Sequence, residues 1–257
     1  MTSVDQSAAG QQALAVPHPR TRASLDGQAE AAATLRRAWD SGRLPHAWLF
    51  TGARGIGKAT LAYRFAKFVL AGSTGSAGGL FGDAPDELAP ADAPAVHQVA
   101  TGSHPDLFAL EPGRINPETN KVSQEILAGH VGQAVQFCFM TPAAARWRVV
   151  IVDPADAMNL TAANRLLKVL EEPPRQALLL LVSHQPARLL PTIRSRCARL
   201  AMPVLADATV AQHLMQFRQD LAERDAHALA QLAEGSIGRA LALASAGGLN
   251  LYREMLA

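Results

Sequence analysis

The stretch Trp48-Leu-Phe-Thr-Gly-Ala-Arg-Gly-Ile-Gly-Lys-Ala-Thr60 decides the fold, because it combines a strand, a glycine loop and the start of a helix. Residues 46–51 are apolar enough for a buried strand, and an amphipathic helical pattern continues to about residue 70. Between them, Gly52, Gly57 and Lys58 have the G-x-x-x-x-G-K spacing of a phosphate-binding loop (P-loop). A glycine turn with a chance lysine is the alternative, but the flanking strand and helix favour phosphate binding.

The P-loop has most of the chemistry that a nucleotide phosphate needs. Its glycines let backbone N–H groups turn inward, and the helix N-terminus adds partial positive charge. Lys58 is placed to reach the outer phosphates, but the hydroxyl residue that normally follows and holds Mg²⁺ is replaced by Ala59. We expect ATP to bind weakly or not at all, with Mg²⁺ only if ATP is bound. The candidate nucleotide-binding residues of this stretch are Gly52, Gly55, Gly57, Lys58 and Thr60.

Composition is that of an ordinary globular protein: the 257 residues are 49% hydrophobic and 18% charged, with a net charge of +2. That charge is too small to predict extensive nucleic-acid contact by itself. Cys138 and Cys197 form no C-x-x-C pair, so we expect neither a disulfide framework nor zinc. With no apolar run for a membrane span and no signal pattern, a cytoplasmic protein is expected. His97 and His104 could be metal ligands, but we expect plain surface residues.

The chain divides by pattern into three parts. Residues 1–20 lack periodicity and are expected to be a disordered leader. Across residues 21–202 apolar strands alternate with helical segments, which is typical of an α/β fold with a parallel sheet flanked by helices. Residues 71–104, rich in Gly, Ala and Pro, are expected to be a flexible excursion with at most one short helix. After Pro203 the pattern is helical only, so residues 203–257 are expected to form a small all-helical lid domain.

The expected elements follow from periodicity and end signals. Strands are expected at residues 46–51, 106–111, 147–152, 177–182 and 197–202. Helices are expected at residues 28–41, 58–70, 123–137, 160–170, 204–221, 224–233 and 236–246.

A second candidate site lies at the end of the strand Arg148-Val-Val-Ile-Val-Asp153. In P-loop proteins an acid at this position contacts Mg²⁺, and α/β sheets place ligands at the carboxyl ends of their strands. In hydrolysing relatives a Glu follows and polarises the attacking water. Here Pro154 follows, and the nearest further acid is Asp156. A helix cap or turn is the alternative role for Asp153.

A third feature is the basic segment that contains Arg194, Arg196 and Arg199. A solvated basic edge explains Arg194 and Arg199, but the surroundings of Arg196 are more specific. Residues 163–174 are Ala-Asn-Arg-Leu-Leu-Lys-Val-Leu-Glu-Glu-Pro-Pro, an apolar strand follows, and Ser195-Arg196-Cys197 comes next. Together with His104-Pro-Asp-Leu107, these segments resemble the bacterial clamp-loader ATPases of the AAA+ superfamily, over about residues 26–245.

Within that family, the absent Glu after Asp153, the absent zinc cysteines and the Gly235-Ser-Ile-Gly-Arg-Ala-Leu241 ending resemble the delta prime branch of DNA polymerase III. The resemblance implies a ring that loads the sliding clamp onto primed DNA in replication, with motor (tau/gamma) and delta subunits as partners. It implies that Arg196 is an arginine finger for ATP held by a neighbouring subunit. It also places Ser183 at the sensor 1 position and Arg239 nearest to sensor 2, one residue out of register.

The chain departs from the family in two ways. Residues 71–104 take the place of the zinc module, and the C-terminal helical collar of about a hundred residues is expected to be absent. We therefore expect a non-motor subunit that does not hydrolyse ATP and donates Arg196. An active motor subunit, with Thr60 and Asp156 standing in for the missing groups, is the alternative. A P-loop small-molecule kinase is a third, but the arginines do not cluster as lid residues of a single-chain cleft.

Overall fold

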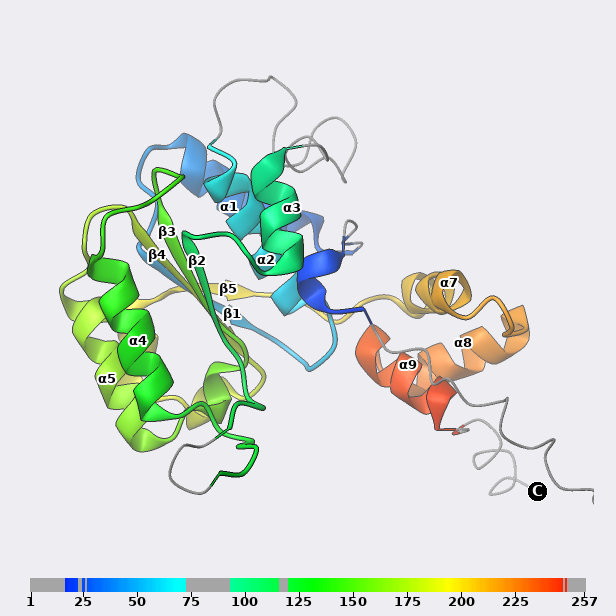
Figure 1. Ribbon diagram of the computed structural model, residues 1–257. Coiled ribbons are helices and arrows are strands. Elements are labelled where there is room, and N and C mark those ends of the chain that lie inside the picture. Colours follow the sequence, from blue (N-terminus) through cyan, green and yellow to red (C-terminus); the bar gives the residue numbers. More distant parts are fainter. Residues whose placement is uncertain are drawn as a thin grey trace, which may run out of the picture.

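The computed structural model describes residues 17–22, 25, 27–72, 93–115, 120–246 and 248. In these residues, five parallel strands form one sheet in the order β2-β3-β4-β1-β5 (Figure 1). The strands are β1 (Ala47–Thr51), β2 (Leu107–Leu110), β3 (Arg148–Val152), β4 (Ala177–Ser183) and β5 (Ala198–Ala201). The expected parallel sheet is confirmed, and each strand lies within about a residue of its expected range.

Helices cover both faces of the sheet. The helices before β5 are α1 (Ala29–Asp40), α2 (Lys58–Leu70), α3 (Pro94–Thr101), α4 (Ala128–Phe139), α5 (Leu160–Glu171) and α6 (Pro191–Arg196). Short 3-10 helices are η1 (Pro19–Thr21), η2 (Ala155–Ala157) and η3 (Pro186–Arg188). Helices α4 and α5 cover one face, and α1, α2 and α3 lie on the other (Figure 1).

Successive side chains of each strand point to opposite faces of the sheet, so each strand packs against both helix layers. In β1, Trp48 and Phe50 pack with α1 and α2, whereas Ala47 and Leu49 pack with the α4 and α5 side. All seven residues of β4 are buried for the same reason. A strand that is apolar on both faces therefore produces the continuous apolar run that the sequence shows.

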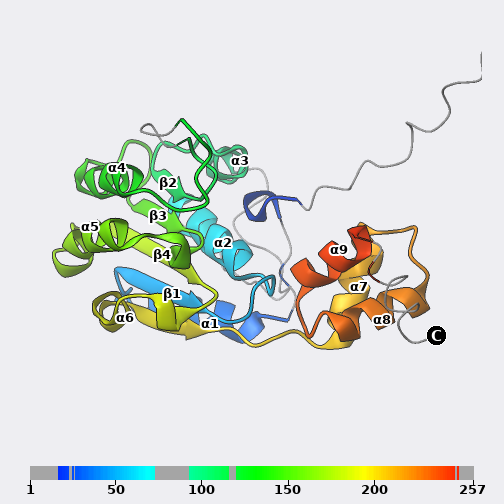
Figure 2. The same cartoon turned by 90° about the horizontal axis from the view of Figure 1, so that it is seen from below.

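A separate helical unit follows the sheet and consists of α7 (Asp207–Phe217), α8 (Glu223–Leu232) and α9 (Ile237–Ser245). Its own apolar core includes Leu214, Leu229 and Leu241. Figure 2 shows this unit beside the sheet, at the end where the loop before α2 lies. Among the described helices, none is long and apolar enough to cross a membrane.

Three expected boundaries need correction, and one belongs to the helix expected over residues 204–221, which is α7 and spans only Asp207–Phe217. The helix expected from residue 123 begins at Ala128, because the Ser123 side chain accepts a hydrogen bond from the Glu125 backbone and Ile126 pairs with Met158. These contacts keep residues 123–126 out of the helix. The expected disordered leader, residues 1–20, extends too far along the chain, because the 3-10 helix η1 begins at Pro19. Residues 1–16 of that leader lie outside the described residues.

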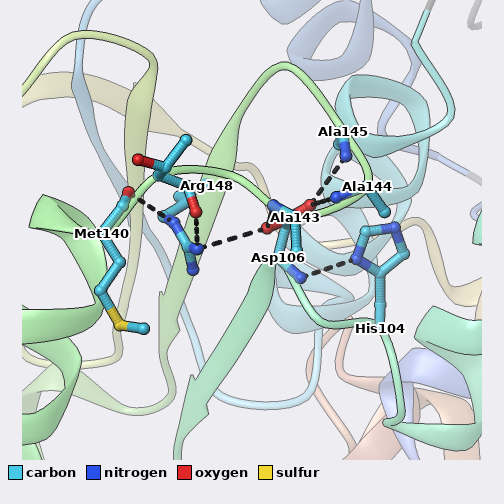
Figure 3. A network of polar contacts seen from close by, with 8 residues as sticks. His104, Asp106, Met140, Ala143, Ala144, Ala145 and Arg148 are labelled. Atoms are coloured by element: carbon cyan, nitrogen blue, oxygen red, sulfur yellow. Dashed lines mark hydrogen bonds and ion pairs between the residues drawn. The ribbon is translucent and has the colours of Figure 1, made fainter.

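The excursion expected over residues 71–104 lies partly outside the described residues, which exclude 73–92. Its last part forms α3, consistent with the short helix allowed there. His97 is exposed as expected, but His104 is only 4% exposed and the expectation of a surface residue is wrong. His104 Nδ1 accepts a hydrogen bond from the backbone N–H of Asp106 (Figure 3). Burial of a histidine is tolerated when its nitrogen has such a partner.

Asp106 is the centre of this network and is fully buried. Its carboxylate accepts hydrogen bonds of 2.7 Å from the backbone N–H groups of Ala143, Ala144 and Ala145, and Arg148 lies 3.7 Å away (Figure 3). These donors keep the pKa of Asp106 below its usual value although burial alone would raise it. The network fixes the loop that leads into β3.

Candidate nucleotide site

The P-loop connects the carboxyl end of β1 to the first residue of α2, Lys58. Gly52, Gly55 and Gly57 have φ values of +144°, +80° and +97°, which L side chains rarely adopt. Gly57 is the N-cap residue of α2, so the loop meets the helix N-terminus, where backbone N–H groups are available to an anion. The structure thus brings the three predicted glycines and the lysine together.

The loop is held against the helical unit, and Gly55 is the contact point. Gly238 N donates a hydrogen bond of 3.1 Å to Gly55 O, and Ser236 Oγ donates one of 2.7 Å to Arg54 O. A Cβ atom on Gly55 would lie 2.4 Å from Ser236 Oγ and 3.0 Å from the Gly238 backbone. We call these four residues, Arg54, Gly55, Ser236 and Gly238, the loop–lid contact. Backbone packed this closely leaves no space for a side chain.

Lys58 is turned toward its own loop. Its Nζ donates hydrogen bonds to Gly52 O at 2.8 Å and Ala53 O at 2.5 Å, and the residue is 3% exposed. Burial lowers the pKa of Lys58 to about 8, against the opposing effect of Asp153 and Asp156. The ammonium therefore has neutral oxygen partners here, and to contact a phosphate it would have to exchange them.

Ala59 and Thr60, the two residues after Lys58, point in different directions from α2. Ala59 is half-buried and packs against the core layer of α1 and α2, while Thr60 is 6% exposed. Consecutive helical residues point about 100° apart, so Thr60 is not in the place of the missing hydroxyl residue. Both residues line the cavity described next.

A cavity of about 950 Å³ lies between the P-loop, the ends of β3 and β4, and the helical unit. Its size is at the upper end of the range of typical ligand pockets, ~300–1,000 Å³. The N-terminal segment closes one side, with Pro17, His18 and Arg22 in the lining. Lys58, Asp153 and Arg239 line it as well, so the cavity gathers predicted residues from three parts of the sequence.

Asp153 follows β3 directly, beside the P-loop. Desolvation and the nearby Glu111 carboxylate raise the pKa of Asp153 to about 6, although Lys58 acts in the opposite direction. Because this environment destabilises the ionised carboxylate, a cation bound next to it would stabilise it. The next residue is Pro154, which has no group that could activate a water molecule.

Asp156 and Ser183 are bound to each other. Ser183 is fully buried and its Oγ donates a 2.6 Å hydrogen bond to Asp156 Oδ1. The backbone N–H groups of His184 and Gln185 donate to Asp156 Oδ2 at 2.5 and 3.0 Å. Asp156 thus fixes the turn after β4, and it accepts three hydrogen bonds where a catalytic base would need a free oxygen. Ser183, which the resemblance places at the sensor 1 position, therefore directs its hydroxyl at this acid.

Arg239 lines the cavity, but its Nη1 pairs with Glu234 Oε2 at 2.6 Å and its side chain is 53% exposed. The residue of α9 that meets the P-loop is Gly238, one position earlier. The residue of α9 that touches the loop therefore has no side chain, and the sensor 2 role of Arg239 stays a prediction.

Arg196 lies apart from the cavity. It ends α6, two residues before β5 begins, so it lies at the amino edge of the parallel sheet, whereas the P-loop follows the carboxyl end of β1. Figure 2 shows α6 at the end of the sheet away from the helical unit. Its Nη2 pairs with Glu171 Oε1 at 3.0 Å, its Nη1 donates to Thr192 O, and the side chain is 36% exposed. Arg196 cannot serve the P-loop of its own chain from this position.

Sequence reasoning missed two groups. Glu111 follows β2 as Asp153 follows β3; it accepts a 2.7 Å hydrogen bond from Tyr63 and lies 3.2 Å from His18. An acid directly after a strand was the available signal. Gln28 is 2% exposed and its amide donates to Ile56 O and Pro203 O, which ties the P-loop to the linker. Nothing in its local sequence predicts that role.

Comparison with known proteins gives the family. The profile described as "DNA polymerase III, delta subunit" matches residues 27–206. The DNA polymerase III subunit delta prime of Pseudomonas aeruginosa is 38% identical over 191 residues, 74% of this chain and 53% of that protein. The delta prime subunit of Bacillus subtilis is 32% identical over 201 residues, 77% of this chain and 54% of that protein. The chain thus spans about half the length of these relatives.

More distant relatives and solved structures share the fold. A tau/gamma subunit of Haemophilus influenzae is 29% identical over 232 residues, 88% of this chain and 30% of that protein. A DNA polymerase III gamma subunit-related protein of Thermotoga maritima aligns with a TM-score of 0.51 at 18% identity, covering 83% of this chain and 58% of that one. The RuvB Holliday junction branch migration motor of the same organism aligns with a TM-score of 0.53 at 15% identity, covering 93% and 67%. The profile covers most of the chain, and the chain therefore belongs to the DNA polymerase III delta subunit family, with delta prime subunits among its relatives and an AAA+ fold.

Proposed function

We propose that this chain is the non-motor, delta prime-type component of a clamp loader, which helps to set a sliding clamp on primed DNA. Its partners in that assembly are motor (tau/gamma) and delta subunits. It binds ATP weakly or not at all, binds Mg²⁺ only with ATP, and does not hydrolyse the nucleotide. Its contribution to hydrolysis is Arg196, given in trans to ATP held by a neighbouring motor subunit.

The observation that carries this proposal is the separation of Arg196 from its own P-loop. The guanidinium is exposed at the amino edge of the sheet, and the P-loop lies at the carboxyl edge. A guanidinium is always charged and can bind two phosphate oxygens at once, which suits a developing charge on a transferred phosphoryl group. An arginine at this position can therefore contact a nucleotide held by a second subunit, but not one held by the P-loop of its own chain.

The lack of hydrolysis has separate support from the cavity. Ala59 stands where a hydroxyl would hold Mg²⁺, and Pro154 stands where a carboxylate would polarise water. Asp156, the alternative acid, is engaged by Ser183 and two backbone N–H groups. Lys58 and Asp153 remain, so a nucleotide would meet a lysine and an acid without the groups that complete the reaction.

A steady-state ATPase assay tests both parts. We expect the purified chain to show no Mg²⁺-dependent turnover, and a complex with the tau/gamma subunit of the same organism to hydrolyse ATP. The variant Arg196→Ala should slow hydrolysis by the complex by ~10³-fold or more, the scale of an arginine finger in P-loop enzymes. The matched control is Arg199→Ala, because Arg199 is also exposed and only three residues away.

Two results would overturn the proposal. One is turnover by the chain alone that is lost in Lys58→Ala, which would make it an active motor subunit. The other is an unchanged rate for the Arg196→Ala complex when analytical ultracentrifugation shows that the complex still forms.

A further inference from the structure

Strand β2 forms one lateral edge of the sheet. It is the outermost strand on its side and pairs with β3 alone among the described strands. Helices α3 and α4 lie on either side of it in both views of the fold (Figure 1, Figure 2). An edge strand carries a row of backbone donors and acceptors that can pair with another chain. The edge of β2 is therefore a possible docking place for an extended segment.

The pairing with β3 shows which backbone groups of β2 face outward. Val149 N donates to Asp106 O at 2.9 Å, so the backbone groups of Asp106 face β3. In a parallel ladder, alternate residues of a strand direct their N–H and C=O groups to the same neighbour. Leu107 and Ala109 therefore direct theirs away from β3, to the free edge.

Half of these outward groups are satisfied within the chain. Leu107 N donates to His104 O at 3.1 Å, and Ala109 O accepts a 3.2 Å hydrogen bond from Arg114 Nη2. Leu107 O and Ala109 N are left without a hydrogen-bond partner among the described residues. One acceptor and one donor, two residues apart, are what an added strand needs to continue the ladder.

A cavity of about 390 Å³ lies along this edge. Its volume is within the range of typical ligand pockets, ~300–1,000 Å³. Leu107 and Ala109 line it, together with Val99 of α3 and Gln133 of α4, which come from opposite faces of the sheet. Side chains of a strand alternate between the two faces, so a strand added beside β2 has space and contacts on both.

The charged groups in the lining favour an acidic ligand. They are Arg20, Arg114 and Glu111. Glu111 is engaged within the chain, because it accepts a 2.7 Å hydrogen bond from Tyr63 and lies 3.2 Å from His18. The two arginines make no ion pair within the described residues, and Arg20 Nε is buried without a hydrogen-bond partner there. A buried charged donor is unfavourable without an acceptor, and a ligand carboxylate would supply one.

We infer that the free edge of β2 and the cavity beside it bind an extended peptide segment of a partner protein, and that this segment carries acidic side chains. Its backbone pairs with Leu107 O and Ala109 N, and its carboxylates bind Arg20 and Arg114. A nucleic-acid strand cannot reproduce the paired amide and carbonyl of an added strand. The inference goes beyond the proposed function and does not depend on it, because Arg196 precedes β5, the strand at the other end of the sheet order.

The first part of the test varies the peptide. The probe is a fluorescein-labelled peptide of eight residues in which Val and Glu alternate, with blocked ends, and its binding to the whole chain is measured by fluorescence anisotropy. One control peptide has Lys in place of each Glu. Two others are N-methylated either at every Val or at every Glu, which removes alternate backbone donors and keeps the side chains.

The second part varies the protein. Ala109→Pro removes an amide that faces the free edge, and proline is tolerated on an edge strand where its nitrogen faces away from the ladder. Ala109→Val is its matched control, because valine keeps the amide. Arg20→Gln removes one charge from the cavity, and Arg37→Gln, at an exposed position of α1, is the matched control.

We expect the Val–Glu peptide to bind the unmodified chain, and the Lys peptide and at least one N-methylated peptide to bind ~10-fold more weakly or worse. Ala109→Pro should weaken binding by a similar factor. Arg20→Gln should weaken it ~3–10-fold, with a shallower salt dependence. The two control variants should bind like the unmodified chain. Hydrogen exchange of the Ala109 amide, followed by NMR, should slow when the peptide is bound.

Several results would overturn the inference. They are no binding of the Val–Glu peptide at about 1 mM, equal binding of both N-methylated peptides and the parent, or full affinity in Ala109→Pro. If circular dichroism shows that Ala109→Pro is unfolded, the N-methylated peptides and Arg20→Gln decide. Tighter binding of an eight-nucleotide thymidine strand that Arg20→Gln weakens would identify a nucleic-acid site instead. Dimerisation of the free chain that Ala109→Pro abolishes, seen by analytical ultracentrifugation, would identify a second copy as the occupant.

Discussion

The two edges of the sheet differ in how fully their charged side chains are bonded within the chain. At the carboxyl edge the charges are engaged within the chain: Lys58 binds carbonyls of its own loop, and Asp156 binds Ser183. At the amino edge Arg146 and Arg175 face solvent. The contrast supports the proposal that the P-loop serves as a structural joint while Arg196, on the far side of the sheet, acts on another subunit.

The largest effect is expected at the amino edge, from Arg196→Lys. Lysine keeps the charge but loses the planar fork that binds two oxygens, so hydrolysis by the complex with tau/gamma should still fall by ~10²-fold or more. Single-turnover hydrolysis at saturating chain measures this, with Arg199→Lys as the control. A full rate in Arg196→Lys would mean that a point charge is enough, and that the geometry of the fork is not used.

At the carboxyl edge, Gly55→Ala should disrupt the loop–lid contact. The new Cβ would lie 2.4 Å from Ser236 Oγ at a φ of +80°, so we expect a loss of about 2–4 kcal/mol in the free energy of unfolding. Gly42→Ala is the matched control, because Gly42 has a φ of +66° but nothing within 4 Å of its Cβ position; it should cost about 1 kcal/mol. Urea unfolding followed by circular dichroism measures both, and equal losses would show that the contact is not tight.

Asp153→Asn should stabilise the free chain in a pH-dependent way. The pKa of Asp153 is raised from its ordinary value to about 6, so between about pH 4 and 6 the folded state binds a proton that the unfolded state has lost. Stability therefore falls as pH rises through this window, and the full penalty is present above it. We expect the variant to be more stable by about 1–2 kcal/mol at pH 7.5 and equal to the unmodified chain near pH 3.5.

Urea unfolding at several pH values checks that difference. The same gain at both ends of the pH range would contradict the electrostatic origin, because an uncharged cause does not titrate. A stabilising substitution at a predicted ligand residue would support the view that the carboxylate is held at a cost without a cation.

The smallest effect is expected from Glu171→Gln, which removes the charge that pairs with Arg196. The pair is exposed on both sides, so stability should change by less than about 0.5 kcal/mol. If Glu171 holds the guanidinium ready for a neighbour, hydrolysis by the complex should slow by a few-fold, through a lower rate at saturation and not through affinity. A faster rate would mean that Glu171 restrains Arg196 instead.

The sheet and its helices could be predicted because their signals are local. The continuous apolar run of β4 requires burial on both faces, and Asn159 caps α5 through its hydrogen bond to Ala162 N. The start of α4 could not be predicted, because its apolar period continues back through Ile126, while the bridge from Ile126 to Met158 comes from a distant segment. Hydrophobic periodicity predicts which side chains are buried, but it does not predict which backbone groups form hydrogen bonds with distant segments.

The sequence suggests individual candidate residues of the site but not how their side chains are arranged. Glycine spacing and an acid after a strand identified the P-loop and Asp153, since both follow from local chemistry. The role of Asp156 depends on a hydrogen bond across 27 residues, and that of Gly238 on the docking of α9, so neither has a local signal. His104 was misplaced for the same reason: its burial depends on the network around Asp106.

The hydrogen bond from Gly238 to Gly55 has a consequence for how this family can vary. Two glycines that meet backbone to backbone are a matched pair: a bulkier residue at either position demands a shift at the other. Among homologues, positions 55 and 238 should therefore covary, with both small where the two units are fused rigidly. Where position 238 carries a long side chain, the bundle should stand farther from the loop and leave space for a phosphate.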